Sequence, residues 1–306
     1  MLRLGDTLRR SASNGLLVCA ALFCLFYPKQ PLAQFFPHFD VQARGGVGRL
    51  FPDHSIEAFT AALDLRVTTL YMGVAVTADK QVVASRSLMV EPDVCSGSRQ
   101  NIPIYQISYE ELKLFDCGKK NPFFPQQQTI PMAKPLLSEV IVASEDHIKN
   151  FSRYAVDYCL EMDCSPAAAA QTHPEPEEYA NIVYNLVQQY LPLERVVIAS
   201  SDMRLLRYWH KTFPAVRLAF LANNKKTLQQ NCADLGFFPS AYCPAYEAAK
   251  KEDAAAALKF KVRFIPSFVN QPKQMLSMKG EKANGIITDR ADLAGHYKMT
   301  LSMPVK

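Results

Sequence analysis

Short apolar runs rich in β-branched residues alternate with amphipathic segments along most of the chain. Runs with strand character lie at residues 41–43, 68–76, 82–84, 154–161, 195–199, 216–220, 241–243, 262–265 and 285–288. Segments with a helical period lie at residues 56–65, 136–143, 177–190, 203–212, 225–234, 246–258 and 272–279. Such alternation is typical of βαβ units with parallel strands, and eight of these units close a barrel. The pattern therefore predicts an α/β fold, a (β/α)8 TIM barrel.

One segment interrupts this alternation. Residues 91–135 are rich in Pro, Gln and Asn, and we expect only one short helix within them, near residues 109–114. We interpret these roughly 45 residues as an insertion over one mouth of the barrel. An open, doubly wound sheet is the competing architecture, but the glycines at positions 45, 46 and 48 lack the spacing of a nucleotide-binding turn.

The composition fits a globular protein with a sizeable core, with 306 residues of which 49% are hydrophobic and 21% charged. That length suits one large domain or two small ones and argues against disorder. Of the net charge of +5, a share of +3 belongs to residues 1–33, where three Arg and one Lys outnumber Asp6. The remaining +2 is too small to favour nucleic acid or an anionic membrane surface as a partner.

The first 33 residues have the order of a secretory signal. A basic start precedes a 13-residue apolar run at positions 15–27, and Pro31-Leu32-Ala33 forms a candidate cleavage site. The run is short for a transmembrane helix, which needs about 20 apolar residues. We expect residues 1–33 to be a signal peptide or an uncleaved N-terminal anchor, the only route to a membrane. Residues 34–306 would then form an exported domain, periplasmic or extracellular.

Six of the eight cysteines follow this signal segment. An even set in an exported chain permits disulfides. Proximity in sequence favours the pairs Cys95 with Cys117, Cys159 with Cys164, and Cys232 with Cys243. Buried free thiols are the alternative, because a core of this size needs no covalent link. Zinc is disfavoured, since no Cys-x-x-Cys pair occurs and the six histidines are scattered.

Several motifs occur in the order of one known family. The run Gln42-Ala43-Arg44-Gly45 is followed by a Pro-Asp-His-Ser segment at 52–55 and, near the end, by Asn-Gly-Ile-Ile-Thr-Asp-Arg-Ala-Asp-Leu at 284–293. These resemble the His-Arg-Gly opening, the Pro-Glu-Asn-Thr turn and the last strand of glycerophosphodiester phosphodiesterases. The resemblance covers residues 41–294 and implies the barrel of the phosphatidylinositol-phosphodiesterase-like superfamily.

The family's acid and base positions are changed in this chain. Family members use two His as acid and base around a divalent cation, magnesium or calcium, which neutralises the phosphodiester. By the resemblance, the first His position falls on Ala43 and the second on Arg86, or on Ser85 if one gap is allowed. Neither position carries an imidazole.

The metal ligands are changed as well. The resemblance places the family's three carboxylate ligands on Tyr71, Gly73 and Glu161, and its phosphate-binding Lys on Asp163. Hard cations take several oxygen ligands, and only Glu161 remains. The resemblance therefore implies a member with a degenerate active site, for which we expect no metal and no other cofactor.

The residues that remain are candidates for binding a ligand. They are Arg44, Asp53, His54, Arg86 and Glu161. Arg44 either binds an anion or pairs with Glu161 or Asp53, and a structural ion pair is the alternative role of Glu161. Arg86 can bring positive charge to the place of the missing cation. His54 as a substitute base is the interpretation we favour least.

Two functions stay open on this evidence. The first is an exported pseudoenzyme that binds a polar or phosphate-bearing small molecule, or a protein partner. The alternative is an active phosphoric diester hydrolase of lipid metabolism that cleaves glycerophosphodiesters to glycerol 3-phosphate and an alcohol. Losing one acid–base group lowers a rate by about 10²–10⁴-fold, which favours the first function. A sugar-processing barrel with Asp53 and Glu161 as paired carboxylates is a third hypothesis.

Overall fold

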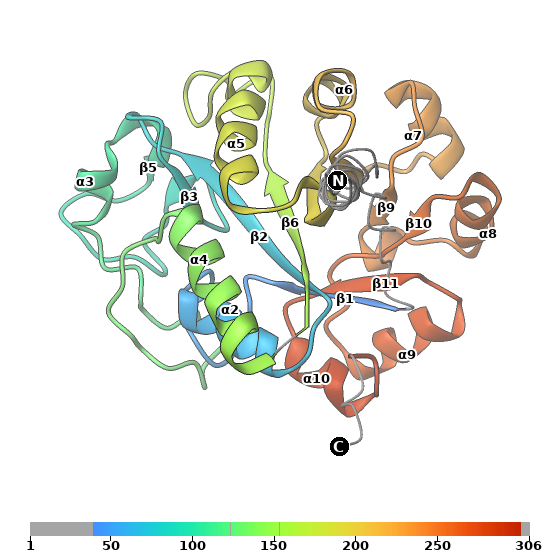
Figure 1. Ribbon diagram of the computed structural model, residues 1–306, viewed down its shortest axis with the longest axis horizontal. Coiled ribbons are helices and arrows are strands. Elements are labelled where there is room, and N and C mark those ends of the chain that lie inside the picture. The colour runs from blue at the N-terminus through green and yellow to red at the C-terminus, as the bar shows by residue number, and fades with distance from the viewer. Residues whose placement is uncertain (1–38, 123, 153, 301–306) are drawn as a thin grey trace, which may run out of the picture. The chain divides into compact units, whose positions relative to one another are not determined.

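A barrel of eight parallel strands forms the centre of the molecule (Figure 1). The computed structural model describes residues 39–122, 124–152 and 154–300. The strands are β1 (Asp40–Arg44), β2 (Thr69–Val76), β6 (Asp157–Met162), β7 (Val196–Ser200), β8 (Arg217–Ala222), β9 (Ala241–Pro244), β10 (Arg263–Phe264) and β11 (Gly285–Thr288). Their order in the sheet is β10-β9-β8-β7-β6-β2-β1-β11. Backbone hydrogen bonds from Asn284 to Phe264 (2.8 Å) and from Ile287 to Pro266 (2.9 Å) nearly close the barrel, which confirms the predicted fold.

Helices surround the strands (Figure 1). They are α2 (Ile56–Asp64), α4 (Leu137–His147), α5 (Pro176–Tyr190), α6 (Met203–Thr212), α7 (Leu228–Leu235), α8 (Lys251–Phe260), α9 (Pro272–Gly280) and α10 (Ala291–His296). The Ser55 hydroxyl accepts a hydrogen bond from the amide of Ala58 and so caps the start of α2. None of the helices in the described ranges is both long and apolar enough to cross a membrane. The expected signal or anchor at 1–33 lies outside the described residues.

Alternate strand residues contribute to two apolar layers. One layer lies between the strands and the helices and includes Val41 of β1 and Phe59 of α2. The other consists of Tyr71, Cys159, Val197, Ala199, Ala219, Ala241, Cys243, Ile265 and Ile287. Small side chains make up much of this second layer, which fills the barrel interior. Because the interior is packed, any binding site has to lie at an end of the barrel.

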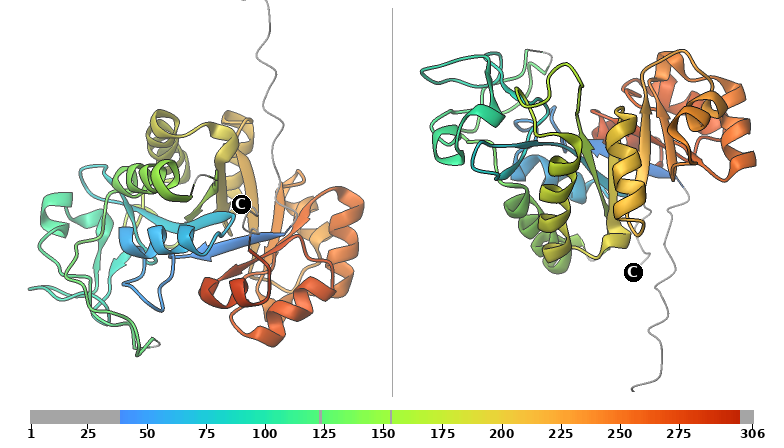
Figure 2. Two further views of the ribbon diagram at one scale, coloured as in Figure 1. Left: turned by 60° about the horizontal axis from the view of Figure 1, so that its bottom comes forward. Right: turned by 90° about the horizontal axis from the view of Figure 1, so that it is seen from above.

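The insertion lies between β2 and α4. Strand β3 (Val82–Ala84) pairs antiparallel with β2 and does not belong to the barrel. Strands β4 (Met89–Val90) and β5 (Ile102–Pro103) form a small antiparallel sheet, followed by the short helix α3 (Tyr109–Leu112). In two further views the insertion lies to one side of the barrel (Figure 2). The small sheet starts at Met89, slightly before the predicted boundary at 91.

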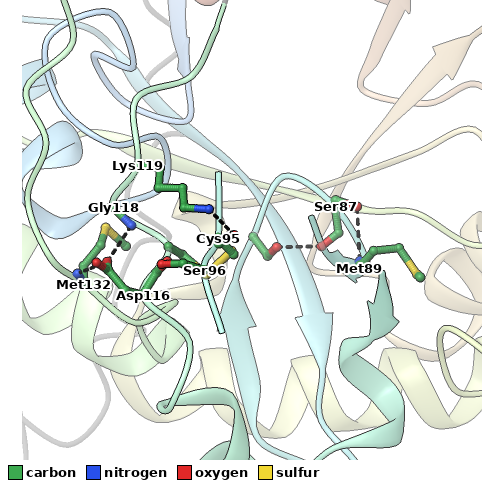
Figure 3. The surroundings of a disulfide bond; sticks show 10 residues. Ser87, Met89, Cys95, Ser96, Asp116, Gly118, Lys119 and Met132 are labelled. Atoms are coloured by element: carbon green, nitrogen blue, oxygen red, sulfur yellow. Dashed lines mark hydrogen bonds between the residues drawn. A yellow bond between two sulfur atoms is a disulfide. The ribbon is translucent and has the colours of Figure 1, made fainter. Parts of the chain in front are cut away.

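A disulfide between Cys95 and Cys117 holds the insertion together (Figure 3). Ser96 and Asp116, next to it in sequence, exchange backbone hydrogen bonds of 2.7 and 3.0 Å. The Asp116 carboxylate also accepts a hydrogen bond from the amide of Met132 at 3.0 Å. Of the three predicted disulfides, this one is confirmed.

The two other predicted disulfides are wrong. Cys159, Cys164, Cys232 and Cys243 are buried free thiols. Cys159 and Cys243 belong to the layer inside the barrel, whereas Cys164 and Cys232 belong to the layer outside it. Each predicted pair therefore has one thiol on either side of the barrel wall. Proximity in sequence did not account for this separation.

Several elements differ from the pattern-based expectation, and three are described here. The strand predicted to start at residue 154 starts at Asp157, whose amide donates to the Thr68 carbonyl at 3.0 Å, while the Tyr154 hydroxyl donates to the Leu63 carbonyl at 2.8 Å. The helix predicted at 246–258 begins only at Lys251. Before it, the amide of Tyr246 donates to the Ser267 carbonyl at 2.8 Å, which prolongs the contact of β9 with the next loop. Helix α10 was not predicted.

Candidate functional site

At the carboxyl ends of β1, β2 and β6, four of the positions predicted for the site lie on neighbouring strands. Arg44, the last residue of β1, lies beside Tyr71 of β2. Gly73 of β2 lies beside Glu161 of β6. In parallel barrels this end carries the binding and catalytic residues. The strands therefore place Arg44 and Glu161 at the barrel mouth, as the sequence predicted.

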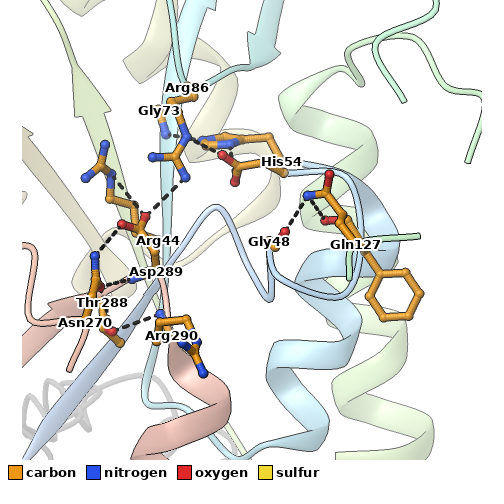
Figure 4. Close-up of polar contacts among 12 residues, drawn as sticks. Arg44, Gly48, His54, Gly73, Arg86, Gln127, Asn270, Thr288, Asp289 and Arg290 are labelled. Atoms are coloured by element: carbon orange, nitrogen blue, oxygen red, sulfur yellow. Dashed lines mark hydrogen bonds and ion pairs between the residues drawn. The ribbon is translucent and has the colours of Figure 1, made fainter. Parts of the chain in front are cut away.

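Loops bring three further candidates to the same mouth. Asp53 and His54 precede α2, and Arg86 follows β3. Close contacts join these three side chains, and Figure 4 shows Arg86 and His54 near Arg44 and Asp289. Segments far apart in sequence thus form one cluster of charged side chains.

Arg86 bridges two carboxylates. Its Nε donates to Asp53 Oδ2, and its Nη2 donates to Asp289 Oδ1 at 3.2 Å. Burial opposes the charge on Asp53, but Arg86 and His54 together hold the pKa of Asp53 below its ordinary value. Burial likewise opposes the charge on Arg86, while Asp53 and Asp289 raise the pKa of Arg86. Arg86 is therefore a fixed cation between Asp53 and Asp289, neither of which is a family metal position.

His54 uses both of its ring nitrogens. Its Nδ1 lies 3.1 Å from Asp53 Oδ1, and its Nε2 accepts a hydrogen bond from the amide of Gly73 at 3.0 Å. The proton therefore lies on Nδ1, because Nε2 acts as the acceptor. Burial lowers the pKa of His54 more than Asp53 raises it. The side chain is 3% exposed, so this neutral imidazole is poorly placed to act as a general base.

Arg44 has a different partner from those expected. Its Nε lies 4.0 Å from Asp289 Oδ1, and its guanidinium lies over the ring of Phe268 at 4.5 Å. The predicted pairing with Glu161 or Asp53 does not occur among the described residues. The reason is positional, since Asp289 follows β11, the strand that pairs with β1. Phe268 is 50% exposed and has a φ of 59°, a left-handed backbone that few bulky residues adopt.

The positions that the sequence resemblance assigns to the family's metal ligands do not suit a hard cation in this chain. A Cβ atom at Gly73 would lie 2.4 Å from the Ser85 carbonyl oxygen, so no carboxylate side chain fits there without a backbone shift. Tyr71 is buried, and its burial raises the pKa of its hydroxyl well above the ordinary value. Across the described ranges, no group of three or more His, Cys, Asp or Glu could hold a metal ion. The metal-free state itself stays a prediction.

The carboxylate of Glu161 has no hydrogen bond or ion pair with any described residue. It is half-buried at the end of β6 and contributes to the raised pKa of Tyr71. The structural ion pair considered for it is therefore not present. Ala43, at the first His position, is fully buried in the outer apolar layer with Phe59. That position supplies no polar atom to the mouth.

The sequence did not identify Asp289 and Asn270 as part of this site. Asn270 Nδ2 donates to Asp289 Oδ2 at 2.9 Å, and Asn270 Oδ1 accepts from the amide of Asp289 at 2.9 Å. The hydroxyl of Thr288 also donates to Asn270 Oδ1 at 3.1 Å. Asp289 lies in the segment 284–293 directly after β11, and Asn270 lies in the loop that follows β10. That position is the signal that could have marked them.

Solved structures share this barrel, although no family model and no curated protein matches the chain. A candidate glycerophosphoryl diester phosphodiesterase from Silicibacter pomeroyi superposes with a TM-score of 0.74 at 21% identity, covering 86% of this chain and 94% of the other. A phosphodiesterase from Oleispira antarctica, in complex with the product sn-glycerol-3-phosphate, gives a TM-score of 0.70 at 14% identity, covering 86% and 98%. A glycerophosphodiester phosphodiesterase from Parabacteroides distasonis gives 0.65 at 17% identity, covering 85% and 98%. The chain therefore has the fold of glycerophosphodiester phosphodiesterases, and identities this low show the fold alone.

Proposed function

We propose that this chain is an exported, catalytically inactive relative of glycerophosphodiester phosphodiesterases that binds a small phosphate-bearing molecule at the barrel mouth. The observation that carries the proposal is the state of Arg86, a permanently charged side chain held by Asp53 and Asp289. The sequence resemblance assigns a family His to Arg86, or to Ser85 if one gap is allowed. A guanidinium gives up no proton at neutral pH, so it replaces neither an acid nor a base.

The rest of the mouth supports inactivity. Phosphodiester hydrolysis needs a base for the attacking oxygen, a proton donor for the leaving oxygen and positive charge on the phosphoryl group. Ala43 offers no donor, and His54 already uses both ring nitrogens. Gly73 leaves no room for a second metal carboxylate beside Glu161. Two requirements of the reaction, the base and the proton donor, are therefore unmet, and the charge that a metal ion would supply is left to arginine side chains alone.

Binding is supported by groups that survive at the mouth. Arg44 lies 4.0 Å from Asp289, beyond hydrogen-bond distance, and can turn its donors to a ligand. The half-exposed ring of Phe268 beside it offers an apolar wall. The Oleispira antarctica phosphodiesterase, which shares this fold, is in complex with the product sn-glycerol-3-phosphate. Together these features favour a small phosphate-bearing ligand over a protein partner.

Calorimetric titration with sn-glycerol-3-phosphate tests this function. We expect saturable binding that weakens about tenfold or more in Arg44→Met, because a charged hydrogen bond contributes about 1.5–3 kcal/mol. Arg99→Met removes the same charge from an exposed site in the insertion and should leave the affinity unchanged. Absence of binding at millimolar ligand, or equal affinities in all three proteins, would contradict a ligand site at Arg44.

The export proposal rests on residues 1–33 as a signal or anchor, with residues 34–306 as the exported domain. The Cys95–Cys117 disulfide supports it, since such bonds persist in oxidising compartments such as the periplasm. Mass spectrometry of the protein isolated from its native cells should find these two cysteines linked and the mature chain in the exported fraction. Recovery of the reduced protein in the cytosol would contradict export.

A further inference from the structure

The insertion encloses a small polar cavity beside the barrel mouth. Asp53 and Arg86 line it from the barrel side, and Glu91, Lys119 and Lys134 line it from the insertion side. Its volume is about 50 Å³. A water molecule needs about 10–15 Å³ measured in this way, so about three to five waters fit. A tetrahedral oxyanion, with one central atom and four oxygens, would take the place of such a water cluster.

Lys134 is the unusual member of this lining. Its side chain is only 7% exposed, yet no hydrogen bond or ion pair joins it to any described residue. Burying an ammonium group without a partner is costly, so such groups normally have an anion or ordered water beside them. Burial lowers the pKa of Lys134, while the charges of Glu91 and Asp53 oppose that change. Among the residues that the structure describes, the ammonium group thus has no direct counterion.

The charges around the cavity leave a positive excess. Asp53 is already engaged by Arg86 and His54. Lys119 donates to the Cys95 carbonyl at 3.1 Å, beside the disulfide, and keeps further donors. Once Asp53 and Arg86 are counted as a pair, the two lysines face only Glu91. The charged side chains that line the cavity therefore have a net charge of one positive unit.

The cavity is also held in shape before any ligand arrives. Gln127 donates to the carbonyl of Gly48 (Figure 4). It also donates to the carbonyl of Phe51 at 2.8 Å, and its Oε1 accepts from the amide of Asn121 at 2.7 Å. These bonds fasten the insertion to the loop that follows β1, and the Cys95–Cys117 disulfide lies in the same insertion. A pre-formed site loses little conformational entropy on binding.

We propose that this cavity is an anion site in which Lys134 and Lys119 hold a tetrahedral oxyanion of the phosphate type. The anion is either free phosphate or the terminal group of a phosphomonoester. This site goes beyond the proposed function, because it depends neither on Arg44 nor on the absence of hydrolysis. It shares with the proposed function only the phosphate chemistry of the ligand. It assigns a ligand to residues of the insertion, outside the family's catalytic positions.

The test is a calorimetric titration of the full chain with inorganic phosphate and, separately, with sn-glycerol-3-phosphate. Lys134→Met should weaken phosphate binding at least about tenfold, and Lys119→Met should weaken it by a smaller factor. Lys120→Gln is the matched control, since Lys120 is the exposed neighbour of Lys119. Lys134→Met should stay folded in phosphate-free buffer because it removes an unpaired buried charge.

The two ligands and Arg44→Met separate this inference from the proposed function. Phosphate binding that is lost in Lys134→Met but kept in Arg44→Met supports the anion site, even if sn-glycerol-3-phosphate does not bind. Tighter binding of sn-glycerol-3-phosphate, lost in Lys134→Met as well, would identify the anion as the head of the mouth ligand. Equal phosphate affinity in wild type and Lys134→Met would overturn the anion site. Absence of phosphate binding at about 10 mM phosphate would overturn it as well.

Discussion

The two ends of the barrel differ in how many hydrogen-bond donors surround their carboxylates. At the amino end, Asp40 is 2% exposed and accepts four hydrogen bonds. They come from the hydroxyls of Thr68 (2.7 Å) and Thr69 (2.8 Å), from the Gln42 amide (2.9 Å) and from Arg263 (3.1 Å). At the carboxyl end, Glu161 has no such bond with any described residue. One carboxylate is surrounded by donors, and the other faces the mouth without one.

This difference separates structural charge from charge left for a ligand. Asp40 joins β1 to the starts of β2 and β10, so its network stabilises the closure of the barrel. The mouth combines a satisfied cluster around Arg86 with groups that lack partners, Glu161 and Lys134. A fold can keep costly unpaired charges where they meet a ligand, and in parallel barrels that place is the carboxyl end.

The largest effect is expected at the amino end. Asp40→Ala removes one carboxylate from four donors and leaves Arg263 without this counterion, which should lower the free energy of unfolding by about 3–5 kcal/mol. Asp64→Ala, at a largely exposed carboxylate, should change it by about 0.5 kcal/mol or less. Urea unfolding measures both. Similar losses in the two variants would show that the Asp40 network is not a structural centre.

Gly73→Ala should destabilise the mouth by about 1–3 kcal/mol, because the added methyl group would meet the Ser85 carbonyl oxygen. Gly280→Ala is the control, since a Cβ there meets nothing within 4 Å. For the same steric reason, restoring the family carboxylates through Tyr71→Glu and Gly73→Asp should give an unstable protein. If Gly73→Ala proved as stable as Gly280→Ala, the metal position would be open after all.

Acid should weaken the fold through His54. Its pKa in the folded state is lowered from 6.5, so below that pH the unfolded chain takes up a proton that the folded chain does not. Stability present above pH 6.5 is therefore lost as the pH falls from 6.5 through the folded pKa, by up to about 1.4 kcal/mol per pH unit. Unfolding measured between neutral and mildly acidic pH should show a shallower dependence in His54→Asn. The exposed His296→Asn should keep the wild-type dependence, and an unchanged slope in His54→Asn would contradict the buried neutral imidazole.

The smallest change is expected for Glu161→Gln. It breaks no hydrogen bond to a described residue, so the free energy of unfolding should change by about 0.5 kcal/mol or less. Glu145→Gln, by contrast, weakens a two-bond contact with Arg195 (2.8 and 2.9 Å) and should lower stability by about 1–2 kcal/mol. Urea unfolding of the two variants side by side decides this. A loss as large for Glu161 as for Glu145 would mean that Glu161 has a structural partner.

Sequence reasoning recovered the barrel because its strands are local apolar runs and its motifs keep their order. The segment 284–293 contains β11 and the start of α10, and the run predicted at 68–76 contains β2. It also brought together Arg44, Asp53, His54 and Arg86, which the folded chain places at one mouth. These are consequences of position along strands and loops, which a sequence does record.

Side-chain partners were less predictable. The contact of Arg86 with Asp289 spans 203 residues, and nothing in the local pattern of either residue indicates it. The wrong cysteine pairs failed for a similar reason, since alternate positions on a strand face opposite sides of the wall. The obstruction at Gly73 comes from the Ser85 carbonyl, a backbone atom whose direction the sequence does not specify. Tertiary geometry decided each of these cases.

The central claim is that this mouth lacks phosphodiester hydrolysis. The most direct measurement is phosphorus NMR of glycerophosphocholine mixed with an equimolar amount of the purified chain, with magnesium or calcium present. We expect the diester signal to persist unchanged and no glycerol 3-phosphate signal to appear, as in a protein-free control. A glycerol 3-phosphate signal that grows with the wild-type chain and disappears with His54→Asn or Arg44→Met would contradict the claim and show an active enzyme.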